Sequence, residues 1–175
     1  GVVMRTAFTW LLWIIASCLV ALLLAMVVIP RLLGWVPLTV LTGSMDPAIP
    51  PGSQVIVKPV NSIDGIAVGD IVTYMPNPND ETLVTHRVVG VQVDSKGEHS
   101  LTVKGDANNA PDPTPVTSKQ LRGVVVYHIP WVGYIALKIN AQAKIVTITV
   151  LGIGLIVYAL WQVIHIIRDR RRAHA

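Results

Sequence analysis

The chain has 175 residues, of which 52% are apolar, and a formal net charge of +4. Its length allows about one folded domain, and its apolar fraction is high for a soluble one. Residues 30–144 carry nine Lys or Arg and nine Asp or Glu, so the basic excess lies outside them and does not indicate a nucleic-acid-binding protein. With Cys18 as the single cysteine, a disulfide framework is excluded.

Residues 7–29 and 145–167 form two long apolar runs without charge, apart from His165 when it is protonated. At 1.5 Å per residue, a run of about 23 residues forms a helix of about 34 Å, which is enough to cross a bilayer. We therefore predict two transmembrane helices. The first run is too long and too uniformly apolar for a signal-peptide core, and no clear small-x-small cleavage site follows it. We expect a retained anchor.

Two finer features of these helices can also be predicted. Pro30 should end the first helix or kink it, because proline lacks an N–H and its ring crowds the preceding turn. Small side chains offer surfaces through which the two helices could pack. They are Ala21 and Ala25 in the first run, and Thr147, Thr149, Gly152 and Gly154 in the second.

The orientation in the membrane follows from the positive charges. Arginines at positions 168, 170, 171 and 172 directly follow the second run, and such clusters stay on the cytoplasmic side. We predict a basic cytoplasmic tail over residues 168–175. With two spans, residues 30–144 then lie outside the cytoplasm, either beyond a cell membrane or in the lumen of the endoplasmic reticulum.

The middle segment, residues 30–144, is predicted to be mainly β. Short Val- and Ile-rich runs are separated by Gly, Pro, Asn and Asp turns, which is typical of a sandwich or a partly closed barrel. The expected fold is therefore a compact β domain anchored by two transmembrane α-helices. The predicted strands are Gln54–Val57, Asp70–Tyr74, Leu83–Val93, Ser100–Val103 and Gly123–Tyr127.

Ser44 is the candidate nucleophile, because it follows Gly43 in a turn close to the first membrane exit. A serine hydroxyl is a poor nucleophile unless a neighbouring base removes its proton. His86, within the longest predicted strand, is suited to that work near neutral pH, although a strand histidine can also be purely structural. His99 and His128 are expected to be a solvated turn residue and a packing residue.

An acid that fixes the tautomer of a histidine improves it as a base. Asp106 and Asp112 lie in a loop rich in Gly, Asn and Pro and are the candidates for this role. Taken alone, either aspartate could simply cap a turn. Only the combination of serine, histidine and aspartates indicates a catalytic site.

These segments, in this order, resemble the type I signal peptidases of the endoplasmic reticulum, of archaea and of some Gram-positive bacteria. The sequence Thr42–Pro47 resembles the nucleophile motif of that family, and residues 69–72 resemble the strand motif that follows. Residues 85–88 resemble the motif with the base, and residues 104–112 the acidic motif. With Gly133 and Tyr134, the matches cover most of residues 40–134.

The resemblance implies a role for each candidate residue. Ser44 corresponds to the nucleophile and His86 to the general base, at a position where ordinary bacterial leader peptidases have lysine. Asp112 corresponds to the acid that orients the histidine, and Asp106 to a second important position. The backbone N–H of Ser44 and the hydroxyl of Thr42 would form the oxyanion hole.

The resemblance also implies an activity and its partners. The chain would be a membrane-bound serine endopeptidase that cleaves signal peptides from exported preproteins after small residues, without a metal or another cofactor. Its partners would be those signal peptides, membrane lipid, and a secretion translocon or accessory subunits, but no nucleic acid.

Two alternatives remain open at the level of the sequence. A Ser-Lys peptidase would use Lys58 or Lys104 as the base and leave His86 structural. A non-enzymatic subunit would use the anchored β domain only to bind secretory proteins.

Overall fold

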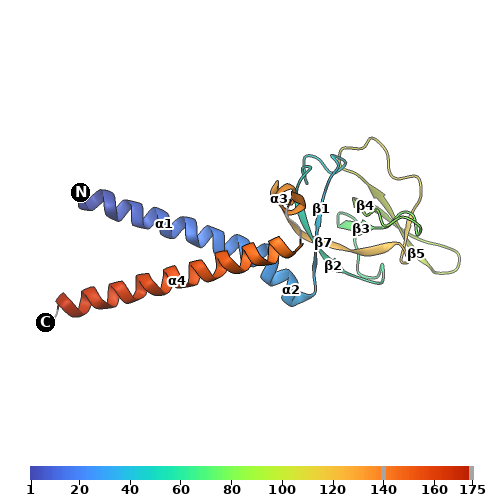
Figure 1. Cartoon of the computed structure of the whole chain (residues 1–175). Coiled ribbons are helices and arrows are strands. Elements are labelled where there is room, and N and C mark those ends of the chain that lie inside the picture. Colours follow the sequence, from blue (N-terminus) through green and yellow to red (C-terminus); the bar gives the residue numbers. More distant parts are fainter. Residues whose placement is uncertain (139–140, 174–175) are drawn as a thin grey trace. The chain divides into compact units, whose positions relative to one another are not determined.

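The computed structural model describes residues 1–138 and 141–173. It divides into two compact units, residues 1–27 with 139–175, and residues 28–138. Residues 139–140 of the predicted domain and 174–175 of the predicted tail lie outside the described residues. The helices are α1 (Val2–Leu23), the π-helical turn η1 (Leu24–Val28), α2 (Ile29–Leu33), α3 (Val132–Lys138) and α4 (Ala141–Ala173) (Figure 1).

Two helical segments, Val2–Leu33 and Ile145–Arg168, are long and apolar enough to cross a membrane by length and composition. Of the two outcomes predicted at Pro30, an end or a kink, the first does not occur: the helix continues to Leu33 and stops at Gly34, whose φ of 70° closes it. The π-helical turn η1 ends at Val28, two residues before Pro30. Such a turn relieves the clash between a proline ring and the preceding turn of helix.

Helices α1 and α4 contact each other within the first unit, and the rings of Trp13 and Tyr158 lie 6.3 Å apart. Ala21 lines an apolar cavity of about 290 Å³ between these helices, and it therefore lies on the side of its helix that was predicted to face the other helix. The predicted contribution of Gly152 and Gly154 is wrong, because a Cβ at either position would have no atom within 4 Å.

The second unit is built on one curled antiparallel sheet in the order β1-β2-β7-β3-β4-β5-β6 (Figure 1). Register shifts in the β2–β7, β3–β7 and β4–β5 pairs increase the local twist of the strands. The strands are β1 (Val36–Thr39), β2 (Gln54–Pro59), β3 (Ile71–Tyr74), β4 (Val84–Val93), β5 (His99–Lys104), β6 (Val116–Thr117) and β7 (Leu121–Ile129).

The predicted fold class, a mainly β domain with two apolar helices, is confirmed. All five predicted strands occur, within a few residues of their predicted ends. The structure adds the short strands β1 and β6 and the helix α3, and it has one curled sheet instead of the two packed sheets of a sandwich.

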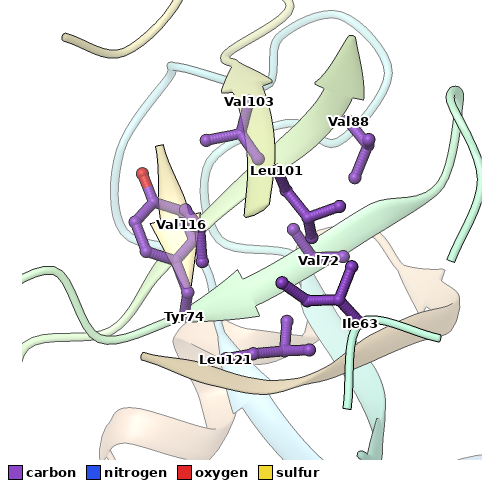
Figure 2. Close-up of a cluster of buried hydrophobic side chains, with 8 residues drawn as sticks. All are labelled: Ile63, Val72, Tyr74, Val88, Leu101, Val103, Val116 and Leu121. Carbon is purple, nitrogen blue, oxygen red and sulfur yellow. The ribbon is translucent and has the colours of Figure 1, made fainter. Parts of the chain in front are cut away.

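Two buried clusters form the core of the second unit. The first joins strands β3, β4, β5 and β7, and Figure 2 shows its members: Ile63, Val72, Tyr74, Val88, Leu101, Val103, Val116 and Leu121. The second lies between β2 and the turn that follows β1, and its members are Val40, Met45, Ile49, Val55 and Val57. The second cluster fixes the segment that carries Ser44.

A substitution at Gly52, which precedes β2, can test how the segment that carries Ser44 is held. Its φ is 82°, and a Cβ there would lie 1.9 Å from the ring of Tyr134. We expect Gly52→Ala to lower the free energy of unfolding by about 2–4 kcal/mol, because it adds a steric clash to a left-handed backbone.

Gly65→Ala is the matched control, because Gly65 has a φ of 83° but open space around a Cβ. Only the backbone strain remains there, and we expect a loss of about 1 kcal/mol. Both values can be measured by denaturant unfolding in detergent micelles. Equal losses in the two variants would contradict the contact with Tyr134.

Candidate active site

Ser44 lies in a turn that is anchored by the buried residues that follow it. Met45 and Ile49 are fully buried in the second core cluster, and the N–H of Ile49 donates to the carbonyl of Met45 at 2.8 Å. The N–H of Asp46 donates to Gly43 at 3.1 Å and closes the turn around the serine. Ser44 itself remains partly exposed. The local sequence, with apolar residues just after the serine, therefore holds the backbone while leaving the hydroxyl accessible.

The hydroxyl of Ser44 lies beside that of Thr42. Their oxygens are 3.3 Å apart, so that one can donate a hydrogen bond to the other. Within the part of the chain that the structure describes, no hydrogen bond joins Ser44 to His86. Contacts between a catalytic serine and its base are often loose in the absence of substrate.

The loop after β5 approaches the serine turn through the backbone. The N–H of Ala107 donates to the carbonyl of Ser44 at 2.9 Å. Gly105 makes this approach possible, because a Cβ there would lie only 2.6 Å from the same carbonyl oxygen. The acidic loop and the nucleophile turn are therefore held against each other.

His86 lies in β4 with its side chain only 9% exposed. Its Nδ1 is 2.8 Å from Oδ2 of Asp112, a normal hydrogen-bond distance. Asp112 is held in place by its own N–H, which donates to the carbonyl of Val103 in β5 at 2.9 Å. The structure thus brings one predicted aspartate to the predicted base.

Asp106, the other predicted aspartate, contacts the next residue of β4 instead. Nε and Nη2 of Arg87 donate to its two carboxylate oxygens at 2.8 and 2.7 Å. This hydrogen bonding by the guanidinium lowers the pKa of Asp106 below its usual value. Nη1 of Arg87 also donates to the carbonyl of Gly69 at 3.0 Å. Arg87 therefore ties the acidic loop to the segment before β3.

Two further residues complete this arrangement, Arg87 and Tyr74, and neither was predicted from the sequence. The hydroxyl of Tyr74 donates a short hydrogen bond to Oδ2 of Asp112, the atom that also contacts His86. Tyr74 lies diagonally across from His86 on the neighbouring strand, since Val72 pairs with His86. The register of the β3–β4 hairpin, if it were known, would have pointed to this tyrosine.

Among the described residues, none of the remaining candidates forms a hydrogen bond or an ion pair with His86 or Asp112. Lys58 is an exposed residue of β2, and Lys104 lies in β5 opposite Arg87. His99 is 3.6 Å from the exposed carboxylate of Asp64, and His128 is in β7 opposite Val55. Among the residues that the structure describes, no three His, Cys, Asp or Glu side chains are grouped so as to hold a metal ion.

The ion pair between Asp106 and Arg87 should contribute to the stability of the folded chain. We expect Asp106→Asn to lower the free energy of unfolding by about 1–2 kcal/mol at pH 7, because a two-point, charge-assisted contact is lost. The pKa of Asp106 is lower in the folded chain than in the unfolded chain. Its contribution is therefore complete above about pH 4, the usual value of an unfolded aspartate, and is lost as the pH falls through the lower folded value.

Denaturant unfolding of both proteins between pH 3 and pH 7 measures this difference. Asp64→Asn is the control, because that carboxylate is 79% exposed and its change should stay within about 0.5 kcal/mol. A difference between the wild type and Asp106→Asn that grows as the pH falls would contradict the assignment.

Comparison with known proteins bears on the same segment. Residues 10–121, which include all the candidate residues above except His128, match the sequence model of the family described as signal peptidase, peptidase S26. Signal peptidase I W of Bacillus subtilis is 37% identical over 94 residues, which are 53% of this chain and 47% of that protein. The chain therefore spans about half the length of this relative.

Fungal relatives are matched over more of their length. The signal peptidase complex catalytic subunit of Chaetomium globosum is 35% identical over 129 residues, and that of Pyricularia oryzae is 35% identical over 127. Each match covers 67% of this chain and 72% of the relative. The chain belongs to the signal peptidase family.

Proposed function

We propose that this chain is a membrane-bound serine endopeptidase that cleaves signal peptides from exported preproteins. The observation that carries the proposal is the 2.8 Å contact between His86 Nδ1 and Asp112 Oδ2, on a loop that also binds the backbone of Ser44. Membership of the signal peptidase family supports the substrate class. The two apolar helices support a location in a membrane.

The chemistry begins with the tautomer of His86. An ionised carboxylate can only accept, so Nδ1 carries the proton that is shared with Asp112, and Nε2 keeps a free lone pair. Nε2 takes the proton of Ser44 as its oxygen attacks the scissile carbonyl, and the imidazolium then returns that proton to the leaving amine. A water molecule, activated in the same way, hydrolyses the acyl-enzyme and frees the serine.

Stabilisation of the oxyanion is assigned to the serine turn. The backbone N–H of Ser44 and the hydroxyl of Thr42 are the candidate donors, and the 3.3 Å between the two hydroxyl oxygens supports the second. One such donor contributes about 3 kcal/mol to the stability of the transition state. Thr42 would then exchange its contact with Ser44 for one with the oxyanion.

The substrate is proposed to bind in an extended form along β1. This strand pairs with β2 on one side and is the first strand of the sheet, so no strand of the described residues pairs with its other edge. It leads directly into the turn with Ser44. Main-chain pairing would supply affinity, and shallow apolar pockets beside the strand would select small side chains near the cleaved bond.

The side of the membrane and the partners are also proposals. The arginines that follow the second apolar run support a cytoplasmic tail, and therefore a catalytic domain on the opposite side. A cell membrane and the endoplasmic reticulum both satisfy this arrangement. The fungal relatives are named as catalytic subunits of a complex, which supports accessory subunits for this chain as well.

The assignment of the nucleophile and the base is tested by substitution. We expect Ser44→Ala and His86→Ala to remain folded and to lose at least about a thousandfold in the rate of preprotein cleavage, because each removes a group that acts directly on the reacting atoms. The rate is measured with purified protein in detergent and a preprotein substrate. Ser62→Ala and His99→Ala, which change exposed residues of the same types, should cleave like the wild type.

Two results of this assay would contradict the proposed function. Cleavage that persists in purified Ser44→Ala would show that Ser44 is not the nucleophile. If the wild type does not cleave and an acylating inhibitor does not label Ser44, a binding subunit is favoured instead.

Lys104→Ala separates the histidine base from a lysine base. Lys104 is the lysine to test, because its charge acts on Asp106 in the acidic loop. We expect this variant to cleave within about threefold of the wild type, since only the true base is indispensable. Lys58→Ala serves as the second lysine in the same assay. A lysine variant as inactive as Ser44→Ala, combined with an active His86→Ala, would assign the Ser-Lys mechanism instead.

A further inference from the structure

Tyr74 belongs to the hydrophobic core and to the candidate site at once. Its side chain is only 5% exposed and packs in the first core cluster, where Figure 2 shows the ring beside Val116 and the hydroxyl directed away from Leu121. A buried tyrosine hydroxyl usually finds a hydrogen-bond partner. Here the partner is a candidate catalytic residue.

The hydroxyl of Tyr74 donates to Oδ2 of Asp112, and the same oxygen contacts Nδ1 of His86 at 2.8 Å. The hydroxyl oxygen is also 3.5 Å from Nδ1, at the outer limit of a hydrogen bond. The two rings lie edge to face, with centroids 6.2 Å apart. One carboxylate oxygen therefore holds two donors, one from β3 and one from β4.

The protons in this cluster can be placed by chemistry. Burial, followed by the hydrogen bond to Asp112, raises the pKa of Tyr74 well above its usual range, so the phenol keeps its proton at any pH at which the site works. The carboxylate accepts from both neighbours and can donate to neither. Tyr74 is thus a permanent donor to the acid that orients His86.

We propose that Tyr74 is a positioning residue of the peptidase, which acts on His86 through Asp112. Its hydroxyl fixes the rotation of the carboxylate and withdraws part of the negative charge from Oδ2. The first effect keeps Nδ1 correctly oriented, and the second limits how strongly Asp112 favours the protonated imidazolium. This inference rests on the proposed function, because it assumes that His86 is the base.

Removal of the hydroxyl should change two kinetic quantities. The rate of the chemical step should fall, because the orientation of His86 becomes less well defined, whereas binding of an extended substrate to the distant β1 edge should not change. The carboxylate, free of one donor, should also favour the imidazolium more strongly. The acid side of the pH profile should therefore move towards higher pH, since His86 must be neutral to act as a base.

Other charges near His86 do not duplicate this effect. Asp106 is also close enough to interact with His86, but its charge is matched by Arg87, with Lys104 nearby. Asp112 and Tyr74 are the titratable groups in direct contact with the imidazole, as far as the described residues show. A change at Tyr74 therefore leaves the other charges in place.

The experiment is Tyr74→Phe in the full-length protein, which keeps the ring in the core and removes one oxygen. We expect kcat for preprotein cleavage to fall about tenfold, the effect of one hydrogen bond to a charged group, with KM within about twofold of the wild type. On the acid side of the profile of kcat/KM against pH, the variant should lose activity at a higher pH than the wild type. Circular dichroism checks that the variant is folded.

Val116→Ala is the matched control, because Val116 packs in the same cluster and its apolar side chain cannot donate a hydrogen bond to Asp112. It should lower the thermal stability at least as much as Tyr74→Phe and leave kcat and the pH profile unchanged. A double-mutant cycle with Asp112→Ala adds a second measurement. In that background, Tyr74→Phe should change kcat by less than about twofold, because the hydroxyl acts through the carboxylate.

The outcomes separate this inference from the proposed function. If Ser44→Ala is inactive but Tyr74→Phe has the kcat and pH profile of the wild type, the role of Tyr74 is wrong and the peptidase stands. The same holds if Val116→Ala reproduces the kinetic change, because the tyrosine is then merely structural. If the wild type does not cleave, or Ser44→Ala does, the peptidase itself is wrong and the role of Tyr74 falls with it.

Discussion

The candidate site depends on one close approach between two loops. The N–H of Ala107 donates to the carbonyl of Ser44, and Gly105 leaves room for that carbonyl because it has no side chain. Neither loop belongs to a strand, so sheet pairing alone does not set their distance. Each is instead anchored at its own end, the serine turn by Met45 and the acidic loop by the hydrogen bond of Asp112 to β5. These two attachments, together with the hydrogen bond between Ala107 and Ser44, set the distance between the two loops.

The two aspartates of the acidic loop differ in the hydrogen-bond donors that they contact. Arg87 binds Asp106 with two charge-assisted hydrogen bonds, so this carboxylate is neutralised and fixes the loop. Asp112 has His86 and Tyr74 as its donors instead. Had Arg87 reached both carboxylates, the histidine would have lost its partner. The separation explains how one short loop can hold both a structural and a candidate catalytic acid.

The sequence predicts the parts of this fold whose signals are local. The five predicted strands and the two apolar helices follow from hydrophobic runs and turn residues, and Ser44, His86 and the aspartates follow from motif order. The strand β6 was missed because it has only two residues, and β1 because it contains Pro37, so the pairing of both depends on neighbouring strands. The π-helical turn before Pro30 was missed because a proline alone does not say how the backbone accommodates it.

The residues alone did not decide between the two aspartates, although the family resemblance favoured Asp112, and they did not reveal the contact of Tyr74. Both depend on how distant segments meet. Each aspartate suits a turn and each suits a catalytic acid, and only the position of Arg87 separates them. Tyr74 is chemically visible in the sequence, but its relation to His86 requires the register of two strands. Local patterns set a register only when one face of the sheet must be buried.

The need to bury one face of the sheet is what holds His86 in place. Side chains alternate along a strand, so His86 shares a face with Val88 of the first core cluster, and Arg87 lies on the other face. A slip of one residue in β4 would expose the valine and direct a guanidinium into the core, which costs far more than a catalytic contact contributes. The packing of the core therefore selects the register, and the register presents the imidazole to Asp112. In this sheet the same hydrophobic burial that stabilises the fold also orients the candidate base.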